Sequence, residues 1–461
     1  MGRTSKYARV LSRTAVVLPA CLSLVTCGSP EHRPNIVLVL VDQLRKDWAD
    51  QWMPETMARA REGVVFEQMR SAAPWTYPSV ISMFSGLYPQ QHGADGAPDN
   101  GTKLSTFDEA VPLFPRDLRS AYYTAGFVTN PFLHTWNPLH TCFDHYEVDE
   151  FIGSQGPTRG NPELVWSEHM FSDSVNASVI AHFDARPAGG EPEFVYVHYI
   201  DVHGPWEGAP FDAGGALEKD TAPEARERAV RYVDRRITEL HDYFDARYGG
   251  DLVFLVTSDH GMEMPGELEL EARLETPHPQ GFPVRQRKAT VHDFNTRVPF
   301  LVLAGRHVPE ARVVTQPCSN IDVCPTVLDF AGLATSASRP SRSLRPAIVS
   351  GDVAGLEHRP VYSLQSAFGR HNDCVVLEER KLFRHVLPGT GQVARFVYDL
   401  ALDPAERAPI GNTFGADGAL LVEAAGTHGL SFENDPVTLP EEELQHLRNL
   451  GYMGGEETRD E

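Results

Sequence analysis

Four segments of the chain are almost uninterrupted runs of apolar residues. They are PNIVLVLVD (34–42), EFVYVHYID (193–201), DLVFLVTSD (251–259) and VPFLVLAG (298–305). A strand inside a parallel sheet is covered on both faces, so its sequence shows such runs in place of strict alternation. Most of the runs are separated by segments that are long enough for crossover helices. The pattern therefore predicts an α/β fold.

Helical periodicity fills several of the segments between these runs. In residues 222–250, apolar residues recur on one helical face before a Gly pair, and further helices are expected at 172–186 and from near Pro325. After about Ala334, the linker-like ATSASRPSRSLRP precedes short alternating runs, PVYSLQS, DCVVLEERKLFRHVL and ARFVYDL. The tail PEEELQHLRNLGYM reads as a closing amphipathic helix. We expect a large mixed, mainly parallel sheet flanked by helices, with a small C-terminal antiparallel sheet.

The first 30 residues differ in character from the rest of the chain. A basic segment, RTSKYARVLSR (3–13), precedes the apolar stretch AVVLPACLSLV, which is typical of an export signal. The letters LVTC resemble a bacterial lipoprotein processing site that would place a lipid on Cys27, and plain secretion is the alternative. We therefore assign 1–30 to a signal peptide, 34–335 to the main α/β domain and 336–455 to a small C-terminal α+β subdomain. The protein is expected to be exported, either periplasmic or at the cell surface.

The charge balance limits the partners of the protein. There are 63 acidic and 41 basic side chains, which give a net charge of −22. Such a field repels nucleic acids and anionic lipids, so we expect no nucleic-acid partner and membrane contact only through a lipid on Cys27. An anionic substrate must therefore be held by a local site. Outside the signal segment, Cys142, Cys318, Cys324 and Cys374 could form disulfides or be buried thiols, and both interpretations stay open.

Two of the apolar runs end in acidic residues. Asp42 ends the first run, and Asp259 ends the third and is followed by His260. The carboxyl ends of strands in an α/β sheet line the ligand crevice, so the three side chains can converge. Two carboxylates and an imidazole form a ready site for a divalent cation. Taken singly, Asp42 could instead be a helix cap and His260 a hydrogen-bonded loop residue.

Thr76 precedes the apolar segment PSVISMFSG, in which Pro78 suits the first turn of a helix. The amides at the start of that helix would face Thr76 and any anion bound against it. A threonine hydroxyl is a weak nucleophile, but coordination to a cation activates it. The alternative is that Thr76 is only an N-cap.

Several motifs, in the same order, resemble the sulfatases and the wider alkaline phosphatase-like superfamily, from Asn35 to about Met453. PNIVLVLVDQLRKD resembles the opening strand with its metal-binding Asp, and SDHGM resembles the second metal-binding pair. TYPSVISMFSGLYPQQHG is similar to the signature C/S-x-P-S-R and the helix that follows. HYIDVHGPW and KATVHDFNTRVPF are similar to the segments that carry an active-site His and a sulfate-contacting Lys.

The resemblance implies an exported, metal-dependent hydrolase that cleaves the sulfate or phosphate ester of a small molecule or glycan. The metal ligands that it implies are Asp42, Thr76, Asp259 and His260. The catalytic residues are Thr76, Lys288, His203 and His292, with Thr76 at the nucleophile position. One divalent cation is expected: Ca²⁺ first, because oxygen ligands suit it, with Mn²⁺ or Zn²⁺ as the alternatives that His260 admits.

The chain also departs from the usual sulfatase pattern. Sulfatases of the usual kind oxidise the signature Cys or Ser to formylglycine, and the β-methyl group of Thr76 rules out that aldehyde. Val80 replaces the signature Arg, and Gln43 replaces the frequent second Asp, which leaves at most a neutral oxygen ligand. Where the family often has Gly-Lys-Trp-His, AGFVTNPFLHTW has no Lys and offers His134 as a loose counterpart.

Threonine nucleophiles occur in the superfamily among phosphodiesterases and nucleotide pyrophosphatases, which hold two zinc ions. Candidates by residue type for a second zinc are Asp201, His203, His278 and His292, although their spacing does not match cleanly. The departures leave a second hypothesis from another class. The chain would then be a non-catalytic surface lipoprotein of the same fold that binds an anionic glycan or a lipid head group.

Overall fold

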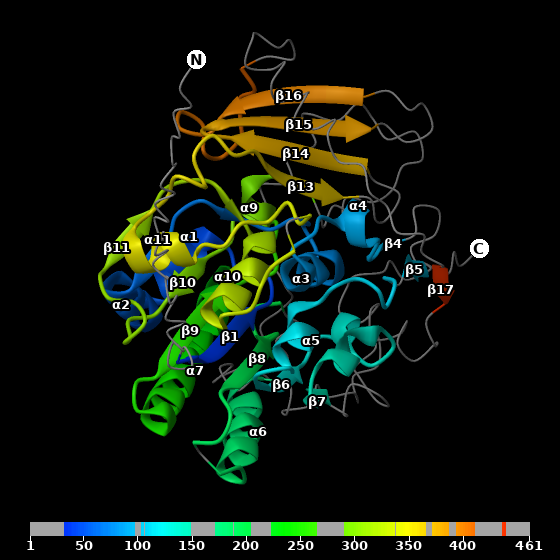
Figure 1. The fold of residues 1–461 in the computed structure, drawn as a ribbon. Coiled ribbons are helices and arrows are strands. Elements are labelled where there is room, and N and C mark those ends of the chain that lie inside the picture. The colour runs from blue at the N-terminus through cyan, green and yellow to red at the C-terminus, as the bar shows by residue number, and fades with distance from the viewer. Residues whose placement is uncertain are drawn as a thin grey trace, which may run out of the picture. The chain divides into compact units, whose positions relative to one another are not determined.

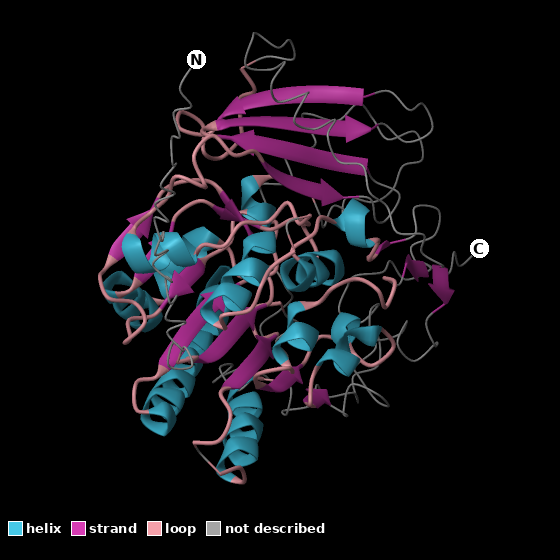
Figure 2. Ribbon diagram, in the orientation of Figure 1, coloured by secondary structure: helices cyan, strands magenta, loops and turns pink. Residues whose placement is uncertain are grey.

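An eight-stranded sheet forms the centre of the protein in the computed structural model (Figures 1 and 2). The structure describes residues 32–96, 103–105, 107–148, 171–187, 189–203, 223–264, 290–336, 338–365, 371–386, 393–410 and 436–438. The strand order is β11 (Arg312–Val314), β2 (Val64–Phe66), β10 (Phe300–Val302), β9 (Leu252–Thr257), β1 (Asn35–Val41), β8 (Glu193–Tyr199), β6 (Tyr123–Val128) and β7 (His145–Val148). β1 pairs in parallel with both β8 and β9. The predicted mixed, mainly parallel sheet is confirmed.

The four apolar runs all form strands of this sheet. β8 and β9 are buried along their whole lengths, and β1 is buried at every residue after Asn35. β10, from the fourth run, lies antiparallel to both of its neighbours, β2 and β9. A strand that is buried on both faces has the same apolar pattern in either direction, so the sequence could not indicate this reversal.

Helices flank the sheet in two groups. In the first group, α7 (Pro223–Tyr248) packs against α1 (Lys46–Trp52), α2 (Pro54–Glu62) and α6 (Ser172–Asp184). In the second, α10 (Val323–Phe330) packs against α3 (Thr76–Ser85), α5 (Phe114–Leu118) and α11 (Arg345–Ser350). The helices expected at 172–186, within 222–250 and from near Pro325 are therefore present as α6, α7 and α10.

The predicted C-terminal antiparallel sheet is confirmed. It consists of β13 (Val361–Gln365), β14 (His371–Leu377), β15 (Arg380–Val386) and β16 (Val393–Asp399), each antiparallel to the next. Figure 1 shows it beside α9 (Asp293–Thr296) and α4 (Pro89–His92). Ser363 Oγ donates to the Ser71 carbonyl at 2.6 Å, and Leu364 N–H donates to the Ala72 carbonyl at 2.9 Å. These bonds join the small sheet to the main part of the chain.

Smaller elements complete the described part of the chain. They are β3 (Met69–Arg70), β12 (Cys318–Ser319), β4 (Asp95–Gly96), β5 (Lys103–Ser105), β17 (Pro436–Thr438), η1 (Pro131–Leu133), η2 (Pro138–Cys142) and η6 (Asn320–Asp322). Cys142, Cys318, Cys324 and Cys374 are buried free thiols. Among the described residues, no helix is long and apolar enough to cross a membrane.

The predicted domain boundaries are not settled by these elements. The described residues from Arg33 onward belong to one unit, and the boundary between 335 and 336 stays a prediction. The predicted signal peptide (1–30), the lipid site at Cys27 and the closing helix (440–453) lie outside the described residues.

Candidate active site

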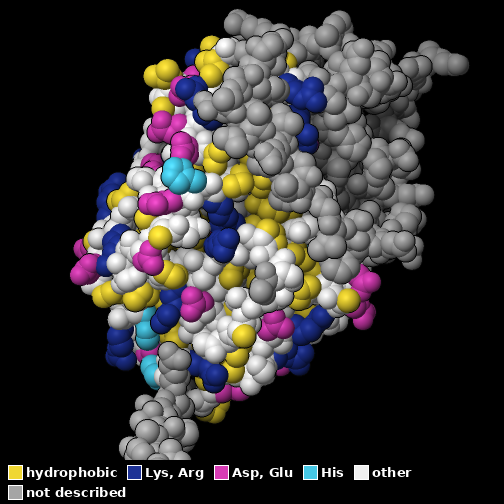
Figure 3. All heavy atoms as spheres, turned by 45° about the horizontal axis from the view of Figure 1, so that its top comes forward, with side chains coloured by type: hydrophobic (Ala, Val, Ile, Leu, Met, Phe, Trp, Pro, Cys, Tyr) yellow, Lys and Arg dark blue, Asp and Glu magenta, His cyan; other side chains and the backbone are white. Residues whose placement is uncertain are grey.

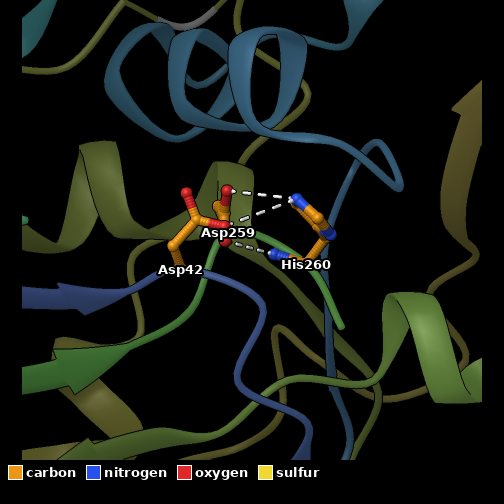
Figure 4. A group of neighbouring side chains, drawn as sticks. All are labelled: Asp42, Asp259 and His260. Atoms are coloured by element: carbon orange, nitrogen blue, oxygen red, sulfur yellow. Dashed lines mark hydrogen bonds and ion pairs between the residues drawn. The ribbon is translucent and has the colours of Figure 1, made fainter. Parts of the chain in front are cut away.

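Acidic side chains from two strand ends meet at one edge of the central sheet. Asp42 directly follows β1, while Asp259 and His260 follow β9. Because β1 and β9 are parallel neighbours, their carboxyl ends lie at the same edge. One ligand atom of each of the three residues lies within 4.8 Å of the other two, although more than 200 sequence positions separate Asp42 from Asp259. Figure 4 shows the His260 ring facing the two carboxylates.

The two carboxylate oxygens of Asp259 have different environments. Oδ1 accepts hydrogen bonds from the backbone N–H of His260 at 2.8 Å and of Gln43 at 3.2 Å. Oδ2 is buried, accepts no hydrogen bond from the described residues, and lies 3.4 Å from His260 Nε2. The backbone therefore fixes one oxygen of Asp259, and the other lies on the side of His260.

His260 has a defined tautomer. Its Nδ1 lies 2.6 Å from the Gly261 carbonyl oxygen, which can only accept a hydrogen bond, so Nδ1 carries the hydrogen. In the neutral form of this ring Nε2 presents a lone pair, and it lies 3.4 Å from Asp259 Oδ2 and 3.9 Å from Asp42 Oδ1. A lone pair that faces two buried carboxylates is unfavourable unless a cation lies among them. The three residues therefore fit a divalent cation.

Thr76 lies at this group of residues. Helix α3 begins at Thr76, two residues before Pro78, and its N-cap is Trp75, so the interpretation of Thr76 as an N-cap is wrong. Thr76 Oγ1 is 3.4 Å from Asp42 Oδ2 and 3.4 Å from His260 Nε2. The helix is held there because Ser79 Oγ donates to the Asp259 carbonyl at 2.5 Å. The first turn of α3 thereby places a fully buried hydroxyl beside the acidic strand ends.

Two buried residues near Asp42 were not identified from the sequence. Asn130 Nδ2 donates to Asp42 Oδ2 at 2.6 Å, and His198 Nε2 lies 3.6 Å from the same oxygen. Burial lowers the pKa of His198 to about 4. Asn130 follows the end of β6 closely, so the strand-end argument applied to Asp42 could have found it. His198 lies inside the apolar run of β8, where the pattern carries no such signal.

Gln43 and Val80, two of the departures from the sulfatase pattern, are both buried. Gln43 has a left-handed backbone with φ +60°, and its Oε1 accepts no hydrogen bond from the described residues. It could therefore serve as a neutral oxygen ligand next to Asp42. Val80 belongs to the main hydrophobic core, so the residue at the position of the signature Arg packs against apolar side chains.

The other predicted catalytic residues are placed less completely. Lys288 lies outside the described residues. His203 is buried just beyond the carboxyl end of β8, and its backbone N–H donates to the Ile200 carbonyl at 2.9 Å. His292 is the N-cap residue of α9, and its ring stacks on Phe294 with 5.3 Å between the centroids. The roles of these three residues stay predictions.

The candidates for a second zinc do not form a cluster in the described part of the chain. Within it, Asp42, Asp259 and His260 are the one group of three or more His, Cys, Asp or Glu residues that could hold an ion. Asp201 Oδ1 instead accepts from the Ser172 N–H at 3.1 Å and from Ser172 Oγ at 2.7 Å, at the start of α6. His278 lies outside the described residues.

Comparison with known proteins gives consistent matches. A family model described as Sulfatase matches residues 34–333. The chain is 25% identical over 394 residues to an N-acetylgalactosamine-6-sulfatase of Canis lupus familiaris, covering 76% of this chain and 72% of that protein. It is 22% identical over 387 residues to an extracellular sulfatase SULF-1 homolog of Drosophila melanogaster, covering 76% of this chain. The match spans only 34% of the length of the Drosophila protein.

Solved structures share the fold. A structure of BT4656 in complex with its substrate D-glucosamine-2-N,6-O-disulfate superposes with a TM-score of 0.63 at 15% identity, covering 85% of this chain and 96% of that chain. A phosphonate monoester hydrolase of Agrobacterium radiobacter superposes with a TM-score of 0.61 at 17% identity, covering 85% and 94%. At these identities the likeness is one of fold.

Proposed function

The chain belongs to the sulfatase family, and from this membership we propose an exported, metal-dependent hydrolase that cleaves sulfate or phosphate esters with Thr76 as its nucleophile. The family resemblance of the sequence motifs is thereby confirmed. The observation that carries the proposal is the position of the Thr76 hydroxyl, 3.4 Å from both Asp42 Oδ2 and His260 Nε2. Relatives named for sulfated sugars make a sulfated glycan the first substrate class to test, with phosphorus esters second.

The ion-binding residues in this proposal are Asp42, Asp259 and His260, with Thr76 Oγ1 beside them. We add Gln43, next in sequence to Asp42, as a candidate neutral oxygen ligand. A divalent cation held there supplies positive charge that makes the Thr76 hydroxyl more acidic and polarises a substrate oxygen. Ca²⁺ is the first candidate, and Mn²⁺ and Zn²⁺ are the alternatives.

The remaining chemistry is assigned to groups of the chain itself. The Thr76 hydroxyl proton passes to water, Oγ1 attacks the sulfur or phosphorus atom, and the bond to the alcohol breaks. His203 or His292 gives the departing alcohol its proton. Lys288 and the first-turn amides of α3 stabilise charge on the substrate's other oxygens. Water then hydrolyses the Thr76 ester, which releases sulfate or phosphate and restores the hydroxyl.

The test compares substitutions at one position on a panel of esters. Purified protein with Ca²⁺, Mn²⁺ or Zn²⁺ is assayed on nitrophenyl sulfate, nitrophenyl phosphate and bis-nitrophenyl phosphate. Thr76→Val keeps the branched shape and removes the hydroxyl, so we expect turnover to fall by about 10³-fold or more. Thr76→Ser keeps the hydroxyl and should retain turnover within roughly a factor of ten of the parent.

Two outcomes would contradict the proposal in different ways. A Thr76→Val variant as active as the parent would remove Thr76 from the mechanism. A parent with no turnover on any ester under any of the three ions would favour the second hypothesis, a non-catalytic protein that binds an anionic glycan or lipid head group. The buried Val80 at the signature Arg position is the observation that keeps this second hypothesis open.

Export and lipid attachment at Cys27 complete the proposal. They are supported by the basic and apolar pattern of residues 1–30 and by the relative named as an extracellular sulfatase. Mass spectrometry of the mature N-terminal peptide tests them. A diacylglyceryl-modified Cys27 would support the lipid anchor, a cleaved chain without lipid would indicate plain secretion, and an unprocessed Met1 would contradict export.

A further inference from the structure

We propose that Asn130 is a positioning residue of this site. Its side-chain amide orients the Asp42 carboxylate for the cation and donates a hydrogen bond to Thr76 Oγ1. The inference rests on the proposed function. Asn130 is fully buried, and its Nδ2 lies 2.6 Å from Asp42 Oδ2 and 3.5 Å from Thr76 Oγ1. It therefore contacts both Asp42, a proposed ligand of the ion, and Thr76, the proposed nucleophile.

The orientation of the Asn130 amide is fixed by the backbone of η1. Asn130 is the N-cap of η1, and its Oδ1 accepts a hydrogen bond from the Phe132 N–H at 2.9 Å. A backbone N–H can only donate, so the oxygen must lie on that side and the NH₂ group on the other. Pro131, at the first position of η1, suits this cap geometry. The NH₂ group is thus committed to Asp42 and Thr76.

Asp42 and Asp259 are held by the same kind of arrangement. In Asp259, two backbone N–H groups fix Oδ1 and leave Oδ2 on the side of His260. In Asp42, Asn130 fixes Oδ2, and Oδ1 is the oxygen that lies 3.9 Å from His260 Nε2. The backbone N–H of Asp42 cannot take this part, because it donates to the Tyr199 carbonyl at 2.8 Å. Asn130 therefore does for Asp42 what the backbone does for Asp259.

The contact with Thr76 adds a second effect. The position of the signature Arg is taken by Val80, which is buried in the apolar core. A neutral amide near Thr76 Oγ1 can partly stabilise negative charge on that oxygen without introducing a buried cation. Hydrogen bonds in such a buried site are electrostatically stronger than in water.

The experiment separates the donor role of Asn130 from its role as a cap. Asn130→Ser keeps an oxygen that can cap η1, because serine is also a good N-cap, but it has no amide to reach Asp42. The matched control is Asn137→Ser. Asn137 caps η2 in the same way, with the Leu139 N–H at 3.0 Å, but its amide donates to the Phe132 and His134 carbonyls.

The parent, Asn130→Ser and Asn137→Ser are compared in three measurements. These are the Mn²⁺ affinity by calorimetry, kcat and KM on the ester of the panel that the parent turns over fastest, and the melting temperature. We expect Asn130→Ser to weaken Mn²⁺ binding by about 10- to 100-fold and to lower kcat by a similar factor, as for other residues that orient metal ligands. KM should change less than about threefold, and the melting temperature should match that of the Asn137→Ser variant. Asn137→Ser should leave Mn²⁺ affinity within about twofold of the parent.

The outcomes distinguish this inference from the proposed function. A parent that neither binds Mn²⁺ nor turns over any ester overturns the proposed function and this inference with it. A parent that binds Mn²⁺, with an Asn130→Ser variant of equal affinity and kcat, overturns the positioning role alone. Equal losses of Mn²⁺ affinity in Asn130→Ser and Asn137→Ser would also overturn it, because they would point to a general disturbance of the loop. If the parent binds Mn²⁺ without turnover, the affinity comparison decides the inference.

Discussion

Gln43, which follows Asp42 in the sequence, combines a strained backbone with a buried amide oxygen. Its φ of +60° lies in the left-handed region, which costs a residue with a side chain roughly 1–2 kcal/mol relative to its ordinary conformation. Its backbone N–H donates to Asp259 Oδ1, and its side-chain Oε1 accepts no hydrogen bond from the described residues. Strain of this kind tends to be kept at functional sites. Ion binding by Oε1 would account for both features.

We therefore predict that replacing Gln43 with glycine weakens metal binding without lowering the stability of the metal-free protein. Gln43→Gly should leave the free energy of unfolding without metal unchanged or raise it by up to about 1 kcal/mol, because glycine adopts this backbone freely. The same variant should bind Mn²⁺ about 10-fold more weakly, since a ligand oxygen is lost. Urea unfolding without metal and calorimetric titration with Mn²⁺ check the two parts.

His358→Gly is the control for this prediction. His358 has a similar backbone, with φ +52°, but its side chain is exposed, with Nδ1 2.6 Å from Glu378 Oε1. Its substitution should leave Mn²⁺ affinity unchanged. A Gln43→Gly variant that binds Mn²⁺ as tightly as the parent would show that Gln43 is not a ligand.

Some residues of the site could be predicted from the sequence, and others could not. Asp42 and Asp259 could be brought together because each ends an apolar run, and parallel strands end at a common edge. Asn130 also follows a strand end, but an Asn directly before Pro131 equally fits an ordinary N-cap, so its sequence alone does not indicate a role at the site. The left-handed φ of Gln43 depends on the path of the chain between β1 and α1, and local sequence does not specify it.

At the scale of elements, a buried ion network attaches the C-terminal sheet to α9. Lys381 of β15 is fully buried, with Nζ 2.9 Å from Asp293 Oδ1 and 2.8 Å from Glu406 Oε1. Arg70 of β3 also pairs with Asp293, at 2.7 Å and 3.1 Å. Burial alone would raise the pKa of Asp293, but Arg70 and Lys381 hold it well below its ordinary value. The network fixes the helix that begins directly after His292.

We predict that Lys381→Met lowers the free energy of unfolding by about 3–5 kcal/mol, because it leaves a buried carboxylate, Glu406, without this cation. The matched control is Arg231→Met, which breaks an exposed pair with Glu227 on α7 at 2.8 Å and should cost at most about 0.5 kcal/mol. Urea unfolding of the three proteins measures both values. A loss for Lys381→Met no larger than that of the control would mean that the network adds no stability.

Most of the larger helices and strands could be predicted from the sequence. Uninterrupted apolar runs gave the central strands, and alternating runs gave β13 to β16, because burial on two faces or on one produces these two patterns. The direction of β10 was not readable, since direction depends on how the chain returns to the sheet. The ion network was equally hidden, because its members come from distant segments whose charges look like ordinary surface residues.

At the scale of the whole molecule, the dominant electrostatic feature is the net charge of −22. On the face in Figure 3, acidic side chains are interspersed with Lys, Arg and apolar side chains. The overall field still opposes the approach of an anionic ester. The proposed site must therefore overcome this repulsion with its bound ion and local donors.

We predict that kcat/KM for an anionic ester rises about two- to fivefold between roughly 0.02 and 0.2 M NaCl, because salt screens the repulsion between enzyme and substrate. The kcat should stay nearly constant, since the bound ester is close to its partners and is screened little. Initial rates on the best ester of the panel, over a salt series, give both quantities. A fall of kcat/KM with salt would show that a local positive surface guides the substrate.

The position of β1 between β8 and β9 has a consequence for biosynthesis. β1 leaves the ribosome well before its two neighbours, which lie at Glu193–Tyr199 and Leu252–Thr257. A nascent chain shorter than this lacks both Asp259 and His260, so it cannot assemble the cation group whatever the metal supply. Such distant pairing slows folding, because the loop must close before any contact repays it. Binding of a metal ion would therefore indicate that β1 and β9 have paired.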